Sequence, residues 1–423
     1  MGGTLSATQR VEPLEKPPDV SVRVPGSKSL TNRALVCAAL AEGKSTLTGA
    51  LQADDTDAMI GGLRALGIDI GADENATLLT VVGAAGELPA GPLSIDARLS
   101  GTTARFLAPV LSVGEGPYVL DGGEPLRERP MGPLVEALRS LGGDVYEMGE
   151  PDSLPLRIGG GAHGGAVELP GHVSSQFLSG LLLAGPLFPD GVDIRLTSPL
   201  VSVPYVSMTR AVMAAFGVDV SATRVQAGSY RATDYLIEPD ASAASYFFAA
   251  AAITGGRVMV EGLGTASLQG DLAFVDLLEQ MGADVTRSET STTVTGTGEL
   301  HGIEADLADL SDTAQTLAAV AVFADSPTTL TGIGFIRRKE TDRLANTVRE
   351  LVRCGIEATE DPDGFTIRPG APQPATIETY DDHRMAMSFA LLGLRGAGIE
   401  ITDPRCVAKT YPRFFDDLDQ LRR

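Results

Sequence analysis

An internal repeat restricts the fold of this chain more than any other feature of its sequence. Five segments show the pattern of an amphipathic helix, then a glycine, then a short strand, and their glycines lie 65 to 75 positions apart. A repeat of this length indicates one structural unit copied along the chain. Each glycine stands where a helix is predicted to end, a position that favours left-handed backbone. These glycines are Gly67, Gly142, Gly217, Gly282 and Gly355. The five strands are predicted to end near Ile70, Val145, Val220, Val285 and Ala358, and a sixth helix near the end of the chain has no strand after it.

A second kind of helix alternates with the first and is richer in alanine and other small residues. Each copy is followed by a strand-like segment, such as STLTGAL after the first copy and IEITDP after the last. Helices that are apolar on most faces are expected inside a domain, with the sheets packed outside them. The repeat is therefore about 70 residues of helix, strand, helix and strand, and six repeats make two domains of three. The six predicted inner helices span residues 29–43, 100–114, 174–185, 240–256, 312–325 and 382–396.

Every inner helix begins with a cluster of Ser, Thr, Asn or Asp. Simple N-capping explains one such residue per helix, at about 1 kcal/mol each. The motifs SKSLTNR, SGTTAR, SSQ and DDHR supply several polar residues each, which is more than capping needs. If the inner helices of a domain run parallel, their N-termini converge and form an anion site from backbone dipoles.

The net charge of -22 restricts the partners of this 423-residue chain. Such a charge repels nucleic acid and anionic membranes, so we expect neither as a partner. No apolar run approaches the roughly 18 residues of a membrane span. Three cysteines without CxxC spacing indicate a reducing compartment, which predicts a cytoplasmic protein without a structural metal site.

The cations recur at similar places within the repeats, beside hydroxyl groups. Besides Lys28, Arg33 and Arg384, they lie in RERPM, RRKETDR and AKTYPRF. Arginine suits bidentate recognition of carboxylate or phosphate, and lysine suits point-charge contact, so these cations predict anionic ligands. Glu340, among these cations, and Asp312, at a helix start, could each act as a general acid or base, although capping explains Asp312 equally well. His383 is one of only four histidines and lies beside Arg384.

The ordered motifs VPGSKSLTNR, SGTTAR, RERPM, SSQF, KETDR, DDHRMAM and AKTYPRF resemble the 5-enolpyruvylshikimate-3-phosphate synthase family, from about Val24 to Phe415. The resemblance implies an α/β (α+β) fold of two similar inside-out α/β barrel domains, with three repeated units in each. The first domain is predicted at residues 27–237. The second is predicted at residues 1–26 and 238–423, with the active site in the cleft between the two.

The resemblance also implies a reaction. The carboxyvinyl group of phosphoenolpyruvate moves to the 5-hydroxyl of shikimate 3-phosphate, through a tetrahedral intermediate, and phosphate is released. No metal or organic cofactor is implied, and the protein is expected to act as a monomer on small anionic substrates.

The family's roles transfer position by position. Asp312 would accept the hydroxyl proton, Glu340 would donate a proton to the methylene carbon with Lys28 as a rival, and His383 is a further catalytic candidate. The residues implied for shikimate 3-phosphate are Lys28, Ser29, Arg33, Ser174, Ser175, Gln176, Ser202, Asp312 and Lys339. The residues implied for phosphoenolpyruvate are Lys28, Gly101, Arg129, Arg343, Arg384 and Lys409.

Two positions depart from the family pattern: Leu99 and Phe335 stand where asparagine is common. Each removes one polar ligand contact, which leaves sensitivity to the herbicide glyphosate open. Two alternatives share the scaffold, an enolpyruvyl transferase acting on UDP-N-acetylglucosamine and a non-catalytic phosphometabolite sensor. The loop before RERPM lacks the cysteine that is usual in the first, and a sensor would not need Asp312 and Glu340.

Overall fold

The computed structural model describes residues 8–73 and 77–422. The chain divides into two compact units. The middle unit comprises Gly26–Glu238, and the end unit comprises Met1–Pro25 together with Pro239–Arg423. The chain therefore passes between the units twice, after Pro25 and after Glu238.

Three buried helices form the interior of each unit. Nearly every residue of these helices is buried, because apolar and small residues occupy most of their faces. The inner helices of the middle unit are α1 (Lys28–Leu40), α3 (Gly101–Val113) and α6 (Ser175–Ala184). Those of the end unit are α8 (Ala241–Thr254), α10 (Ala314–Ala321) and α12 (His383–Gly393).

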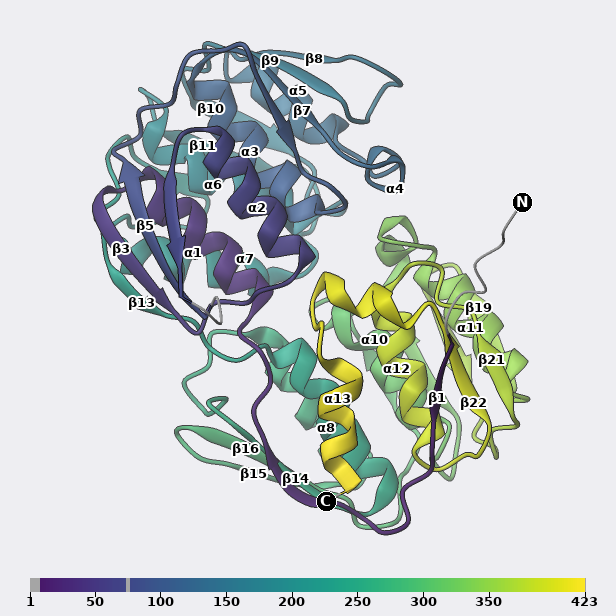
Figure 1. The fold of residues 1–423 in the computed structure, drawn as a ribbon. Helices are drawn as coiled ribbons and strands as arrows, with labels where there is room; N and C mark the ends of the chain where they lie inside the picture. The colour runs from purple at the N-terminus through teal and green to yellow at the C-terminus, as the bar shows by residue number, and fades with distance from the viewer. Residues whose placement is uncertain (1–7, 74–76, 423) are drawn as a thin grey trace, which may run out of the picture. The chain divides into compact units, whose positions relative to one another are not determined.

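Each unit also contains three sheets, which pack on its inner helices (Figure 1). In the middle unit the sheets are β13-β3-β5-β4, β6-β7-β9-β8 and β10-β11-β12. Their strands are β3 (Glu42–Thr48), β4 (Asp69–Ala72), β5 (Leu78–Ala84), β6 (Leu93–Asp96), β7 (Glu115–Asp121), β8 (Asp144–Glu147), β9 (Leu156–Gly160), β10 (Gly165–Leu169), β11 (Val192–Leu196), β12 (Arg224–Val225) and β13 (Asp234–Leu236).

The end unit repeats this arrangement with the sheets β15-β16-β14-β2, β17-β18-β20-β19 and β1-β22-β21. Their strands are β1 (Thr8–Val11), β2 (Asp19–Val22), β14 (Arg257–Glu261), β15 (Asp284–Arg287), β16 (Ser291–Thr295), β17 (Glu304–Asp306), β18 (Thr328–Thr331), β19 (Ala358–Asp361), β20 (Gly364–Ile367), β21 (Ala375–Ile377) and β22 (Ile399–Thr402).

Four of the six inner helices connect two parallel strands of one sheet, as in β6-α3-β7 and β21-α12-β22. Parallel neighbours need such a crossover. The first inner helix of each unit differs. Strand β2 precedes α1 but pairs with β14 of the end unit, and β13 precedes α8 but pairs with β3 of the middle unit. The strand before each of these two helices therefore belongs to a sheet of the unit that the chain is leaving.

The predicted glycine caps are present at the ends of the outer helices. Gly67, Gly142, Gly217, Gly282 and Gly355 have φ values of 78°, 92°, 83°, 109° and 76°. They follow α2 (Asp54–Ala65), α5 (Gly132–Ser140), α7 (Val203–Ala215), α9 (Phe274–Gln280) and α11 (Arg343–Arg353). The sixth outer helix, α13 (Phe414–Leu418), closes the repeat without a strand.

One predicted strand is wrong. Residues 218–220, after Gly217, form no strand, and β12 begins only at Arg224. A tight turn, with paired backbone groups of Ser221 and Arg224, leads into that short strand. The third strand of the sheet that contains β10 and β11 is therefore Arg224–Val225, which the sequence repeat did not predict.

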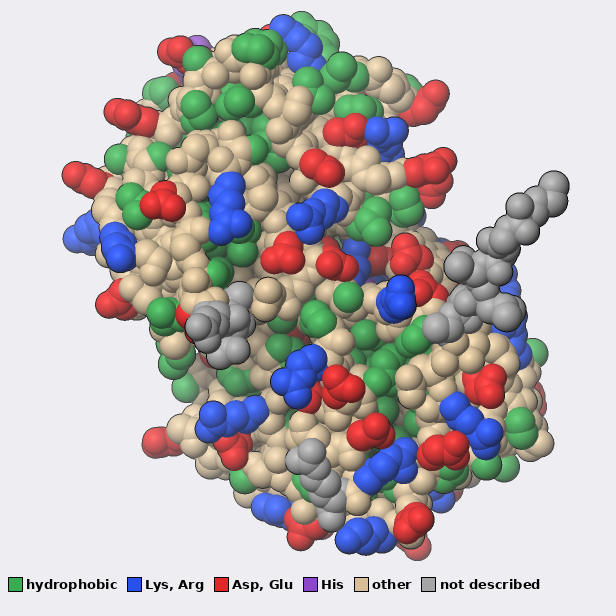
Figure 2. Space-filling view, viewed as in Figure 1, with side chains coloured by type: hydrophobic (Ala, Val, Ile, Leu, Met, Phe, Trp, Pro, Cys, Tyr) green, Lys and Arg blue, Asp and Glu red, His purple; other side chains and the backbone are tan. Residues whose placement is uncertain are grey.

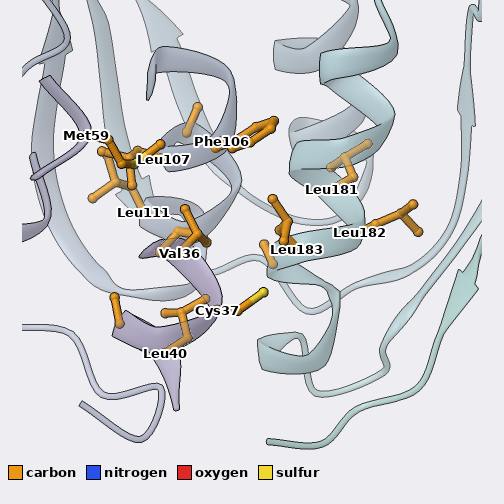
Figure 3. Close-up of a cluster of buried hydrophobic side chains, with 14 of the residues drawn as sticks. Val36, Cys37, Leu40, Met59, Phe106, Leu107, Leu111, Leu181, Leu182 and Leu183 are labelled. Carbon is orange, nitrogen blue, oxygen red and sulfur yellow. The ribbon is translucent and has the colours of Figure 1, made fainter. Parts of the chain in front are cut away.

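Each unit has a hydrophobic core of its own. In the middle unit Val36, Cys37 and Leu40 of α1 lie among residues from α2, α3 and α6 (Figure 3). Acidic and basic side chains are interspersed over the visible surface (Figure 2). No helix among the described residues is long and apolar enough to cross a membrane. The prediction of a mixed α/β fold of six repeated units is confirmed.

Candidate active site

The polar residues at the starts of the inner helices cap five of the six. At each of these starts a side-chain oxygen accepts a hydrogen bond from a backbone N–H of the first turn, as expected of N-caps. The capping residues are Ser27, Ser100, Ser174, Asp240 and Asp382. The exception is α10, where a 3-10 turn, Ser311–Thr313, precedes the helix without a side-chain cap. Asp312 is therefore not an N-cap.

In the middle unit Arg33 is a buried cation with 2 % of its surface exposed. Its guanidinium donates to Thr209 Oγ1 at 2.7 Å and to the carbonyls of Ser29 and Tyr205 at 2.9 and 3.1 Å. No carboxylate among the described residues forms an ion pair with it, and burial lowers the pKa of Arg33 to about 10. A buried cation without an anionic partner raises the affinity of its surroundings for an anion.

Lys28, at the start of α1, lies close to Asp55 at the start of α2. Its Nζ is 3.1 Å from Asp55 Oδ2, and both side chains are largely buried. The sequence reasoning missed Asp55, although the run of acids in QADDTDAM was the available signal.

Gly101 and Arg129 lie in direct contact in the middle unit. A Cβ on Gly101 would lie 2.9 Å from Arg129 Cζ. The sequence prediction gave Gly101 the role of letting a ligand approach the backbone. A larger residue at this position would require the Arg129 guanidinium to shift.

The remaining candidates of the middle unit lie at helix starts. Ser174 caps α6 through a 3.2 Å bond from Gln176 N, and Ser175 is buried beside it. Gln176 Nε2 donates to Thr102 Oγ1 at 3.1 Å. Ser202 precedes α7 with a left-handed φ of 55°, which is uncommon for a residue other than glycine.

In the end unit Asp312 is held by three cations. Its Oδ1 accepts from Lys339 Nζ at 2.6 Å and from Arg343 Nη1 at 3.4 Å, and its Oδ2 accepts from Arg384 Nη2 at 2.7 Å. Burial lowers the pKa of Lys339, and the charge of Arg343 adds to this effect, while Asp312 opposes it. The carboxylate and its cations come from two successive repeats.

Arg343 is the centre of this end-unit cluster. Its Nε lies 2.7 Å from Asp382 Oδ2 and its Nη2 lies 2.8 Å from Glu340 Oε2. Burial alone would lower the pKa of Arg343, but Asp382, Glu340 and Asp312 together raise it. Asp382 is fully buried and was missed by the sequence reasoning, although it stands inside the quoted motif DDHR.

The two other predicted residues of the end unit lie at the edges of the same cluster. Lys409 Nζ is 3.8 Å from Glu340 Oε1. His383 is buried, with Nδ1 3.6 Å from Asp382 Oδ1. The structure therefore gathers every predicted residue of the end unit into one cluster, which comprises Asp312, Lys339, Glu340, Arg343, His383, Arg384 and Lys409 and also contains Asp382.

The two departures from the family pattern lie beside these groups. Leu99 immediately precedes the cap Ser100 and is 37 % exposed. The ring of Phe335 lies 5.7 Å from Lys339 Nζ, so an aromatic face contacts the lysine. No group of three or more metal-ligating side chains occurs among the residues that the structure describes.

Comparisons with known proteins identify the family. The sequence profile of EPSP synthase (3-phosphoshikimate 1-carboxyvinyltransferase) matches residues 15–418. The 3-phosphoshikimate 1-carboxyvinyltransferase of Nostoc punctiforme is 45 % identical over 98 % of this chain and 100 % of its own. That of Methanoculleus marisnigri is 43 % identical over 95 % of this chain and 96 % of its own. A solved EPSP synthase from Acinetobacter baumannii superposes with a TM-score of 0.83 at 29 % identity, over 98 % of each chain. The chain belongs to the EPSP synthase family.

Proposed function

We propose that this chain is a 3-phosphoshikimate 1-carboxyvinyltransferase, an enzyme of the shikimate pathway for aromatic amino acids. It would transfer the carboxyvinyl group of phosphoenolpyruvate to the 5-hydroxyl of shikimate 3-phosphate. The observation that carries the proposal is the setting of Asp312. This carboxylate caps no helix and lies among Lys339, Arg343 and Arg384. An acid held among cations combines a proton acceptor with a site for anions.

The charges of both units fit two anionic substrates. The middle unit supplies Arg33, a buried cation without a carboxylate partner among the described residues. In the end unit the four cations Lys339, Arg343, Arg384 and Lys409 are paired with the carboxylates Asp312, Glu340 and Asp382. We assign shikimate 3-phosphate to Lys28, Ser29, Arg33, Ser174, Ser175, Gln176, Ser202, Asp312 and Lys339. We assign phosphoenolpyruvate to Lys28, Gly101, Arg129, Arg343, Arg384 and Lys409.

The proposed reaction has two stages. In the addition stage Asp312 takes the proton of the 5-hydroxyl, whose oxygen bonds to C2 of phosphoenolpyruvate, while Glu340 protonates the methylene carbon. In the elimination stage that carbon loses a proton, the bond from C2 to the phosphate oxygen breaks, and phosphate leaves. Arginines and lysines beside the reacting centre stabilise the charge that develops on the leaving phosphate.

The assignment has a direct test. Purified protein is expected to release phosphate only when phosphoenolpyruvate and shikimate 3-phosphate are both present. Each substrate alone is the control. Turnover with UDP-N-acetylglucosamine in place of shikimate 3-phosphate would contradict the assignment, and substrate binding without turnover would indicate the sensor alternative.

Glu340→Gln tests the proton donor. The amide keeps the size of the side chain but cannot donate a carboxyl proton, so kcat is expected to fall by about 10²- to 10⁴-fold. Shikimate 3-phosphate should still bind, as calorimetry can measure. Glu279→Gln, on the exposed face of α9, is the matched control and should leave kcat unchanged. Full turnover by the Glu340→Gln protein would contradict Glu340 as the proton donor and would favour Lys28.

We further propose that the enzyme acts as a monomer in the cytoplasm. Three free, buried cysteines support a reducing compartment.

A further inference from the structure

Arg105 is a buried arginine to which the proposed chemistry gives no role. It lies in α3, one turn after Gly101, and is 4 % exposed. A guanidinium has five N–H donors in a planar fork, so it can fix several acceptors at once. The contacts of Arg105 show which groups it fixes.

Two contacts anchor the guanidinium. Its Nη2 donates to the backbone carbonyl of Pro130 at 3.0 Å, and its Cζ lies 5.1 Å from the centre of the Phe177 ring. Pro130 belongs to the RERPM segment, and Phe177 belongs to α6. Arg105 is therefore held from two elements besides its own helix.

The third contact is with Gln176. Arg105 Nη1 donates to Gln176 Oε1 at 2.8 Å, while Gln176 Nε2 donates to Thr102 Oγ1 at 3.1 Å. An amide group can turn over and exchange its oxygen and nitrogen. Here a cation holds the oxygen and a hydroxyl holds the nitrogen, which favours one of the two orientations. Nε2 has two hydrogens and Thr102 takes one, so the second can serve a ligand.

We propose that Arg105 is a positioning residue that fixes the side-chain amide of Gln176 in its donating orientation. Its guanidinium donates to Gln176 and Pro130, so Arg105 would act through these groups and not on the substrate itself. This inference rests on the proposed function, in which Gln176 binds shikimate 3-phosphate. Without the guanidinium, the amide turns over in part of the molecules and presents its oxygen to an anion, which repels it.

A double-mutant cycle between Arg105 and Gln176 tests the inference. Arg105→Lys keeps the positive charge but lacks the fork that spans Pro130 and Gln176. In the parent protein this change is expected to lower kcat/KM by at least 10-fold, mainly through a higher KM for shikimate 3-phosphate. In a Gln176→Ala background the same change should lower kcat/KM by less than 3-fold, because no amide remains to be oriented. If the role of Arg105 were purely structural, Arg105→Lys would lower kcat/KM by the same factor in both backgrounds.

Controls separate this effect from misfolding. Arg139→Lys, on α5, changes an arginine that also bonds a backbone carbonyl and lies over an aromatic ring, and it should leave kcat/KM within 2-fold. If the Arg105→Lys variant does not fold, Thr102→Val can be used in its place. This substitution removes the hydroxyl that accepts the hydrogen bond from Gln176 Nε2. Thr102→Val should lower kcat/KM in the parent but not in the Gln176→Ala background, and Thr102→Ser should restore it.

The outcomes are distinguishable. A parent protein that does not release phosphate with both substrates contradicts the proposed function. If the parent protein is active, two results would contradict the role of Arg105. One is that Arg105→Lys lowers kcat/KM by less than 3-fold in the parent. The other is that it lowers kcat/KM by the same factor, within 3-fold, in both backgrounds.

Discussion

Asp271 is a buried carboxyl group in the end unit, near the predicted proton acceptor. It is 4 % exposed, and Ser242 Oγ donates to its Oδ2. Burial raises the pKa of Asp271 to about 6, and the charge of Asp312 adds to the rise. Because the folded state binds this proton more tightly than the unfolded state, Asp271 lowers stability once it ionises.

Asp271→Asn is therefore expected to stabilise the protein at pH 7 but not at pH 4. The unfolded pKa is about 3.9. The folded protein thus holds an extra proton between about pH 4 and pH 6, and its stability falls as the pH rises through this window. Two pKa units correspond to about 3 kcal/mol. Urea unfolding at a series of pH values measures the difference, and Asp69→Asn, on the exposed side of β4, is the control. An equal effect of Asp271→Asn at pH 4 and pH 7 would contradict the assignment.

At the residue scale the sequence shows which side chains can carry charge, but not which partner each one takes. Asp312 could be a helix cap or an acid–base residue on sequence evidence alone, because both roles need a carboxylate at a helix start. Only the positions of Lys339 and Arg384, which come from other elements of the end unit, decide between them. Asp382 and Arg105 were missed for a related reason: their roles depend on contacts across the fold.

At the element scale the packing of two inner helices depends on a glycine. Helices α3 and α6 pack together in the middle unit, and Gly180 of α6 faces the backbone of α3. A Cβ on Gly180 would lie 2.2 Å from the carbonyl oxygen of Arg105. Backbone atoms cannot move aside as a side chain can, so the two helices would have to separate.

Gly180→Ala is expected to destabilise the protein by about 1–3 kcal/mol, the usual cost of overpacking a core. Gly61→Ala is the matched control, since no atom lies within 4 Å of its added Cβ in helix α2. Alanine is the better helix former, so this control should gain about 0.5–1 kcal/mol. Thermal unfolding measures both. Equal changes in stability for Gly180→Ala and Gly61→Ala would show that the contact of Gly180 with α3 does not restrict the size of this residue.

The elements themselves were largely predictable from local patterns. Glycines at helix ends and alanine-rich inner helices follow rules that act within a few residues, so the repeat and its helices were predicted. The failure after Gly217 has a different cause. Residues 218–220 are apolar enough for a strand, but the turn at Ser221 and Arg224 supplies the partner of β11 instead.

At the scale of the whole molecule the two units differ in how the chain supplies their strands. The middle unit is one continuous segment that contains all strands of its three sheets. The end unit needs β1 and β2 from residues 8–25, in addition to Pro239–Arg423. The pairing of distant strands could not be predicted from periodicity, because periodicity carries no information about partners.

A fragment spanning residues 26–238 is expected to unfold cooperatively in urea, because its core and sheets are complete. A fragment spanning residues 239–423 lacks β1 and β2, which leaves the strand edges of β22 and β14 exposed, and it should be unfolded or aggregated. Adding a peptide of residues 8–25 should restore structure to it. Circular dichroism measures all three cases, and a stable 239–423 fragment without the peptide would contradict the expectation.

The pairing of β1 with β22 also has a consequence for biosynthesis. A ribosome delivers the partners of the middle unit in one uninterrupted stretch, so that unit can fold while the rest of the chain is still being made. Thr8–Val11 leaves the ribosome before the whole middle unit, whereas its partner Ile399–Thr402 leaves only after that unit. Until the partner has been made, β1 is therefore an unpaired strand that chaperones can bind and proteases can cut.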